Sequence, residues 1–374
     1  MFLDNTGGIL RFRYSTEENG KIVKKAAVYT QTEHNINFSD VDPHAVSVAR
    51  ELQSKGYETY IVGGAVRDLI LGKNPKDFDI ATSASPARIK KIFRNSRIIG
   101  RRFRLVHVFF GSKIIEVSTF RSLKDGSAGN TFGSIDEDVQ RRDFTFNALF
   151  YDPVKQLVVD YVEGINDIKK RLVRPIIPLP EIFTDDPVRM IRAVKYAAAT
   201  GFKLPLYLKW SIKKNSMLLE GVSSSRLTEE IFKIIHSPYA HKIIDDLDNL
   251  ALFKFLQPKT ADLFKSVSGF RNKYLKTFAA LKGETVSEAE IYAALIKDYL
   301  DLTLNWDLIQ GENFKDVFNL VRKFVLPMNP PKVNLYNAIR LIFAQHGIPV
   351  KKYRLKERIR YRRKPKKVKG ENNG

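Results

Sequence analysis

Two carboxylates separated by a single residue, Asp77 and Asp79, are the side chains of this sequence best suited to chemistry. They stand in the segment KDFDIAT, which predicts a β-strand, and alternate residues of a strand point to the same face. Two carboxylates on one face repel each other unless a cation lies between them, and hard oxygen ligands favour Mg²⁺. Phe78 would then point into the core. A solvated strand end is the alternative interpretation.

A glycine pair, Gly63-Gly64, stands between the predicted strand 57–62 and a short predicted helix. Free N–H groups at a helix N-terminus suit phosphate, and glycine lets a triphosphate approach the backbone. Glu116 lies in a later predicted strand. Three carboxylates beside a triphosphate cradle would make a two-metal phosphoryl-transfer site. An ordinary tight turn and an outward-facing polar residue are the alternatives for the glycine pair and for Glu116.

Two kinds of hydrophobic pattern divide the chain. Strand-like segments dominate residues 57–120 and recur at 145–162, whereas helical periodicity takes over after about 182. Ser85 followed by Pro86 predicts a helix start, and Gly111-Ser112 predicts a hairpin turn. We therefore expect an α+β fold, with an α/β head that contains a mixed sheet, an all-α body and a basic tail.

The charge balance points to a polyanionic partner. The formal net charge is +22 over 374 residues, and residues 351–374 contribute +10 of it. Such a field attracts nucleic acid, and the interleaved Tyr353 and Tyr361 could stack on bases. The sequence has no cysteine and no apolar run near the ~20 residues that span a bilayer, so we expect a cytoplasmic protein without a membrane partner.

Four ordered segments carry a resemblance to a known family. They are IVGGAVRDLILG, KDFDIAT, RRDFTFNA at 141–148, and DDPVRMIRAVKYAA from Asp185. Together they resemble the bacterial (class II) tRNA nucleotidyltransferase/poly(A) polymerase family, within the polymerase-β-like superfamily, over roughly residues 40–235. The resemblance implies a polymerase-β-like nucleotidyltransferase head. The segments we expect are an N-terminal extension with one short hairpin (1–42), the catalytic head (43–180), a helical neck (181–240), an all-α RNA-binding body (241–350) and a disordered basic tail (351–374).

The same resemblance assigns roles to individual residues. Asp77 and Asp79 match the metal-binding pair, Glu116 the third carboxylate, and Asp143 a catalytic-motif residue that supports the site. A set of nucleotide-binding positions follows from the motifs: Gly63, Gly64, Arg67, Arg142, Asp186, Arg189, Arg192 and Lys195. Within this set, Asp186 and Arg189 match the pair that reads the base, while Arg192 and Lys195 would continue the same helix face towards the phosphates.

The spacing of Asp186 and Arg189 can also be interpreted without the family. Residues i and i+3 of a helix share a face, so an acceptor beside a forked donor could match a base edge. Alternatively, Asp186 caps the helix, with Pro187 in its first position and Arg189 as a salt-bridge partner. The sequence departs from the family pattern at Asp185, where glutamate is frequent, and at Glu163-Gly164, where a glycine pair is common.

The segment from Gly100 to His107 favours poly(A) addition over CCA addition. Its order of glycine, basic residues, Phe103, Leu105 and histidine resembles the poly(A) polymerase branch, and Arg101, Arg102 and Arg104 are its candidate RNA, primer or specificity residues. We therefore expect a Mg²⁺-dependent adenylyltransferase that uses ATP and releases pyrophosphate at RNA 3′ ends, of mRNA, decay intermediates or tRNA. The alternatives are CCA or partial-CCA addition to tRNA, and an RNA-binding protein with an inactive head.

Deleting residues 351–374 should weaken RNA binding and flatten its dependence on salt, because fewer phosphate counterions are then released. The measurement is the RNA dissociation constant across a salt series. An unchanged slope in the truncated chain would show that this segment takes no part in binding.

Overall fold

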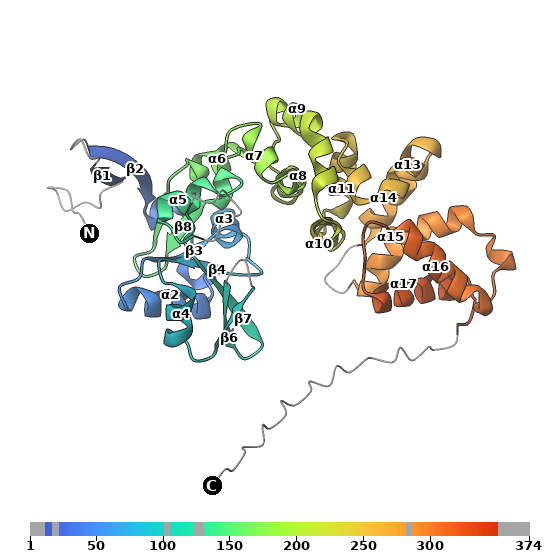
Figure 1. The fold of residues 1–374 in the computed structure, drawn as a ribbon, viewed down its shortest axis with the longest axis horizontal. Helices are drawn as coiled ribbons and strands as arrows, with labels where there is room; N and C mark the ends of the chain where they lie inside the picture. The colour runs from blue at the N-terminus through green and yellow to red at the C-terminus, as the bar shows by residue number, and fades with distance from the viewer. Residues whose placement is uncertain (1–11, 17–21, 101–104, 123–130, 282–285, 351–374) are drawn as a thin grey trace, which may run out of the picture.

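The computed structural model describes residues 12–16, 22–100, 105–122, 131–281 and 286–350 (Figure 1). The head is built on one mixed sheet, and the rest of the described chain is helical, so the predicted α+β architecture is confirmed. The predictions for Arg101, Arg102, Arg104 and the basic tail fall outside the described residues. Within the described ranges, no helix is long and apolar enough to cross a membrane.

In the described part of the chain the sheet has nine strands, and neighbouring strands are antiparallel except for one parallel pair, β4 with β7. The hairpin expected in the N-terminal segment is present, and its second strand joins the main sheet through β9. In spatial order the strands are β1 (Phe12–Thr16), β2 (Ile22–Tyr29), β9 (Leu157–Asp160), β8 (Leu149–Asp152), β3 (Thr59–Val62), β4 (Asp79–Thr82), β7 (Lys113–Thr119), β6 (Leu105–Phe110) and β5 (Ser96–Ile99).

Helices α2 (Pro43–Ser54) and α4 (Pro86–Ile92) cover one face of the sheet. Both begin as their sequences predict: the Asp42 carboxylate accepts from two N–H groups of α2, and Ser85 caps α4 with Pro86 in the first position. The opposite face is packed by α5 (Ile135–Gln140) over its central strands. Successive side chains of the central strands therefore point alternately into the core formed with α2 and α4 and towards the face that carries Asp79.

Helical periodicity after residue 182 is confirmed as a series of helices. The segment 242–256 forms two helices rather than one, because Ala251 adopts a left-handed backbone with φ of 59° between them. The ranges are α7 (Glu181–Asp185), α8 (Val188–Thr200), α9 (Leu206–Asn215), α10 (Ser224–Ile235), α11 (Ala240–Asn249), α12 (Phe253–Leu256), α13 (Pro258–Ser266), α14 (Phe270–Ala280), α15 (Glu288–Thr303), α16 (Phe314–Phe324) and α17 (Lys332–Gln345).

One apolar core continues from the head into these helices. Phe202, just after α8, packs edge-on against Phe146 of the head with ring centroids 5.4 Å apart. Tyr196 of α8 packs edge-on against the same phenylalanine and against Phe144. Burial of these aromatic rings fixes α8 against the head.

The turn from β9 into α6 (Gly164–Lys170) is tightly packed. The buried Asp160 carboxylate accepts hydrogen bonds from the N–H groups of Val162, Gly164 and Ile165 at 2.9 to 3.1 Å. Glu163 takes a left-handed backbone with φ of 63°, where glycine would be favoured. A Cβ on Gly164 would lie 2.3 Å from the carbonyl oxygen of Thr145. Gly164 is therefore required sterically.

Gly164→Ala should destabilise the protein by about 1–3 kcal/mol, because the added methyl group forces backbone to move. Gly221→Ala is the matched control, since a Cβ there meets no atom within 4 Å. The measurement is the free energy of unfolding from denaturant titration. Equal stability of the two variants would contradict the packing described for this turn.

Candidate active site

The carboxylates Asp79 and Glu116 lie side by side on the sheet, on the parallel strands β4 and β7. The predicted strand begins later than expected, at Asp79, so Asp77 precedes it. The expected alternation nevertheless holds: Phe78 is buried in the core, and Asp77 and Asp79 are exposed. Desolvation raises the pKa of Asp79 to about 6, and the charges of Glu116 and Asp77 add to the shift against the opposing charge of Arg142.

This arrangement is chemically suited to a divalent cation, because a cation would offset both the desolvation of the Asp79 carboxylate and its repulsion by Glu116 and Asp77. Carboxylate oxygens are the ligands that Mg²⁺ prefers. Within the described residues, no three metal-ligating side chains converge closely enough to form a metal site by themselves. Asp77, Asp79 and Glu116 would hold an ion together with oxygen ligands that the protein does not supply.

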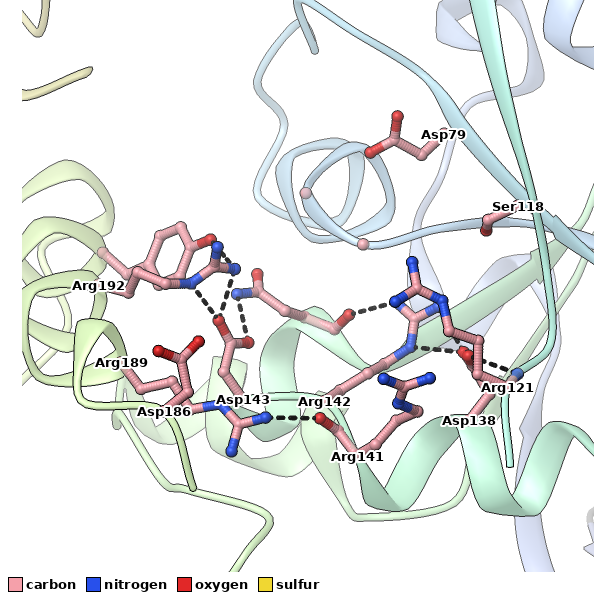
Figure 2. A pocket seen from close by; sticks show the side chains of 14 residues that line it. Asp79, Ser118, Arg121, Asp138, Arg141, Arg142, Asp143, Asp186, Arg189 and Arg192 are labelled. Carbon is pink, nitrogen blue, oxygen red and sulfur yellow. Dashed lines mark hydrogen bonds and ion pairs between the residues drawn. The ribbon is translucent and has the colours of Figure 1, made fainter. Parts of the chain in front are cut away.

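A cleft of about 450 Å³ opens beside Asp79, between the head and α8 (Figure 2). It brings together most of the predicted nucleotide-binding residues. The predicted nucleotide-binding residues that line it are Gly63, Gly64, Arg142, Asp186, Arg189 and Arg192, and the predicted catalytic residues Asp79 and Asp143 line it as well. Glu116 lines a smaller adjoining pocket that shares Asp79 and Arg142 with the cleft. Asp77, Arg67 and Lys195 are not among the residues that line either one.

The glycine turn has the backbone that its sequence suggests. Gly63 adopts φ of 74° and ψ of −136°, a conformation that side chains disfavour, and α3 (Gly64–Ile70) begins immediately afterwards. Arg67 of α3 does not line the cleft. Its Nη1 donates to Asn147 Oδ1 at 2.8 Å, and its Nε donates to Asp68 at 2.8 Å. Arg67 thereby links α3, which follows the glycine turn, to Asn147.

Asp143 is a buried carboxylate that holds Arg192. Arg192 Nε donates to Asp143 Oδ2 at 2.8 Å, and the N–H of Phe144 donates to Oδ1 at the same distance. Burial alone would raise the pKa of Asp143, but the Arg192 charge and the hydrogen bonds it accepts outweigh that effect and lower it. Figure 2 shows the two side chains meeting across the head–α8 boundary. In this structure Asp143 thus positions Arg192, and its predicted catalytic role stays a prediction.

The structure corrects the geometry predicted for the base-reading pair. Asp186 is not on a helix with Arg189, because α7 ends at Asp185 and α8 begins at Val188. Its extended backbone lets its carboxylate accept from the Val188 N–H at 3.2 Å, which is the capping role considered as an alternative. Both side chains still line the same cleft.

Each member of that pair has its own ionic partner. Arg189 is buried and donates from Nη1 to Asp185 at 2.7 Å and from Nη2 to the Arg141 carbonyl at 2.9 Å. Asp186 accepts from Arg226 of α10, with both carboxylate oxygens 2.9 Å from Nη2. The Asp186–Arg189 salt bridge considered as the alternative does not form, since Arg189 pairs with Asp185 and Asp186 pairs with Arg226.

Lys195 does not extend the cleft as predicted. Its Nζ donates to Glu230 of α10 at 2.6 Å, and both side chains are largely buried. Lys195 lies three residues beyond Arg192 on α8. Because an α-helix has 3.6 residues per turn, the two side chains do not point in the same direction, and that of Lys195 points towards α10. In this structure its charge supports the packing of α8 on α10.

The cleft also contains six residues that were not predicted: Ser118, Arg121, Asp138, Arg141, Asn147 and Tyr196. Arg121 follows the strand of Glu116, and Arg141 directly precedes the predicted Arg142, so proximity to the motifs was the available signal. Burial lowers the pKa of Arg141 to about 10, and the charges of Arg121, Arg189 and Arg142 contribute to that decrease. Arginines that repel one another in a cleft favour a polyanionic ligand.

Comparisons with known proteins show what this chain is similar to. A family model described as "Poly A polymerase head domain" matches residues 59–174, and one described as "Probable RNA and SrmB- binding site of polymerase A" matches residues 201–264. Poly(A) polymerase I of Escherichia coli O157:H7 is 39% identical over 273 residues, 68% of this chain and 58% of the relative. The CCA-adding enzyme of Geobacillus kaustophilus is 35% identical over 241 residues, 62% of this chain and 59% of the relative.

Among solved structures, the Bacillus stearothermophilus CCA-adding enzyme in complex with CTP is similar, with a TM-score of 0.57 and 27% identity over 82% of this chain and 83% of that one. The mixed-sheet head and the helical body of this chain therefore match the fold of that solved enzyme. The chain belongs to the bacterial class II tRNA nucleotidyltransferase/poly(A) polymerase family. The chain spans less than two thirds of the length of the two curated relatives named above.

Arg192→Met should lower the free energy of unfolding by about 3 kcal/mol at neutral pH, because it leaves the Asp143 carboxylate buried without its cation. The lowered pKa of Asp143 stabilises the folded state above the unfolded pKa, and this contribution is lost as pH falls through the folded pKa. The difference between variant and wild type should therefore shrink below about pH 4.

Chemical denaturation of both proteins at pH 7 and at about pH 3, below the ordinary aspartate pKa, measures this difference. The double variant Asp143→Asn, Arg192→Met is the control and should recover part of the loss, since it carries no buried charge there. A stability difference that is independent of pH would contradict the ion-pair account.

Proposed function

We propose that this protein transfers adenylate from ATP to the 3′-hydroxyl of RNA without a template, with release of pyrophosphate. The observation that carries the proposal is the pairing of Asp79 with Glu116 at the edge of an arginine-lined cleft. Family membership supports RNA 3′-end nucleotidyl transfer in general. The choice of adenylate, and the identity of the RNAs as mRNA, decay intermediates or tRNA, is the finer part of the proposal.

The proposed chemistry divides between the two sides of the cleft. Asp77, Asp79 and Glu116 supply negative charge at the point where the attacking hydroxyl must lose a proton. Divalent ions such as Mg²⁺, held by these carboxylates, would activate that hydroxyl and neutralise the departing pyrophosphate. On the other side, Arg142 and Arg192 are fixed by Asp138 and Asp143, so their charges are preorganised for phosphates.

Base recognition is proposed for Asp186 and Arg189, which line the cleft beyond the phosphate-binding arginines. Arg189 is a rigid donor, because it is buried and bound to Asp185 and to backbone carbonyls. Asp186 is an acceptor whose present partner, Arg226, is half exposed. A donor and an acceptor in fixed positions can match the Watson–Crick edge of a base without a template strand.

We also propose a division of labour along the chain. The head (43–180) would carry catalysis, the neck (181–240) base recognition, and the body (241–350) and tail (351–374) the grip on RNA. The N-terminal segment (1–42) has no proposed role in the reaction; its hairpin extends the head sheet. The match of residues 201–264 to a family model named for RNA binding supports an RNA-binding role beyond the head.

CCA addition to tRNA is the second candidate. The CCA-adding enzyme of Bacillus stearothermophilus matches most of this chain in three dimensions. The identity to Poly(A) polymerase I, 39%, is higher than the identity to the CCA-adding enzyme of Geobacillus kaustophilus, 35%, and this favours adenylate addition. An inactive head is disfavoured because Asp77, Asp79 and Glu116 are all present.

Purified protein with Mg²⁺ should extend an unstructured RNA with ATP alone by many nucleotides. Parallel reactions contain CTP alone, or a tRNA that lacks its 3′ end, and the products are resolved by length. Short extension that requires CTP and occurs only on the tRNA would establish the second candidate instead.

Asp77→Ala and Asp79→Ala serve as catalytic controls in the same assay. Both should abolish nucleotide incorporation and leave RNA affinity nearly unchanged, because the carboxylates act on the reacting groups. Normal turnover by either variant would show that its carboxylate has been assigned the wrong role.

A further inference from the structure

One part of the sheet face that carries Asp79 is not covered by α5. Strand register places Asp79, Glu116, His107 and Arg97 in a single row across β4, β7, β6 and β5. The adjacent row contains Phe109, Ile114 and Asn95. The residues between these rows point to the opposite face, where Val106, Val108 and Ile115 are buried against α2 and α4.

The exposed side chains of this open face are apolar, aromatic and basic. Ile114 is 44% exposed, Phe109 is half-buried without belonging to the apolar core, and Arg97 is exposed. Figure 1 shows α2 and α4 on one side of β6 and β7, and α5 higher up over the other strands. We define Arg97, His107, Phe109 and Ile114 as the strand platform.

The strand platform is continuous with the reacting centre. His107 Nε2 lies 3.2 Å from Glu116 Oε1, and the His107 ring meets Phe109 edge-on with centroids 6.3 Å apart. Leu105, on the same face of β6, lines the small pocket together with Asp79 and Glu116. No break in the sheet separates the carboxylates from the aromatic side chains.

We propose that the strand platform binds the last nucleotides of the RNA that is being extended, with Phe109 as a stacking surface for a base. This inference rests on the proposed function and specifies where its RNA substrate lies. An RNA 3′-hydroxyl that reaches Asp79 and Glu116 must bring its preceding nucleotides over neighbouring protein. β6 lies two strands from β4, roughly 10 Å, a distance that about three stacked nucleotides span.

The chemistry of the strand platform favours single-stranded nucleic acid over a protein partner. Bases stack on aromatic side chains displayed by open sheet faces, and this recognition tolerates any sequence. Arg97, at the outer end of the row, supplies positive charge for a phosphate. A tolerant stacking surface suits an enzyme whose own product becomes its next substrate.

The test compares three full-length variants with the wild type. Phe109→Leu keeps an apolar side chain of similar size but removes the aromatic face, and Phe109→Tyr keeps that face. Tyr14→Leu is the matched control, because Tyr14 is a 51% exposed aromatic residue on β1, at the far edge of the same sheet. Thermal melting of each variant verifies that it is folded.

Two readouts report on the strand platform. The first is a comparison, for each variant, of the KM for RNA with the KM for ATP. The second is the fluorescence of 2-aminopurine placed third from the 3′ end of an RNA, measured without ATP so that it does not depend on turnover. Phe109→Leu should raise the KM for RNA about tenfold, leave the KM for ATP unchanged and abolish quenching of the probe. Phe109→Tyr should restore both, and Tyr14→Leu should match the wild type.

The proposal is overturned if folded Phe109→Leu binds RNA and quenches the probe as the wild type does. It is also overturned if that variant changes only the oligomeric state in sedimentation, which would make the strand platform a protein interface. Failure of the wild type to add AMP would refute the proposed function instead, and the quenching experiment would still decide whether RNA lies on Phe109.

Discussion

The candidate site depends on a β-sheet that fixes two negatively charged carboxylates close to each other. Asp79 and Glu116 are fixed on hydrogen-bonded neighbouring strands and cannot separate. Desolvation raises the pKa of Asp79, and repulsion from Glu116 raises it further. Across the cleft, several positively charged arginines are likewise packed close together. Burial lowers the pKa of Arg141, and the charges of neighbouring arginines lower it further. A cleft with unbalanced negative charge on one side and positive charge on the other is complementary to a cation and a polyphosphate bound together.

The rigidity of the positive side comes from contacts between the head and the helices that follow it. Arg192 belongs to α8, yet its guanidinium is held by Asp143 of the head. Lys195, one turn further along, ties the same helix to Glu230 of α10. Because Phe146 and Tyr196 pack in the shared core beneath these ion pairs, the cleft is the polar edge of a continuous apolar interface. Displacement of α8 would therefore alter the phosphate side of the site directly.

The elements that position the carboxylates could be predicted from sequence because their signals are local. Alternation around Phe78, the cap formed by Ser85 and the turn at Gly111 each depend on residues close in the chain. The helical spacing predicted for Asp186 and Arg189 was wrong because the break between α7 and α8 places Asp186 outside the helix. Its partner Arg226 is 40 residues away in the sequence. Arg141 and Tyr196 were missed for a similar reason: only tertiary packing brings them to one cleft.

The contrast between Asp186 and Arg189 has a consequence for the proposed reading of the base. Arg189 is buried, and removing it from Asp185 and two carbonyl groups would leave polar groups unpaired, at a cost of about 1–3 kcal/mol for each. The partly exposed pair of Asp186 with Arg226 is worth only about 0–1 kcal/mol. A base that enters the cleft can therefore replace Arg226 as the partner of the Asp186 carboxylate at little cost. The Arg189 guanidinium, in contrast, keeps its position, and the base must fit against it. Discrimination between bases would then rest on the fixed donor, and Asp186 would adjust to whichever edge that donor admits.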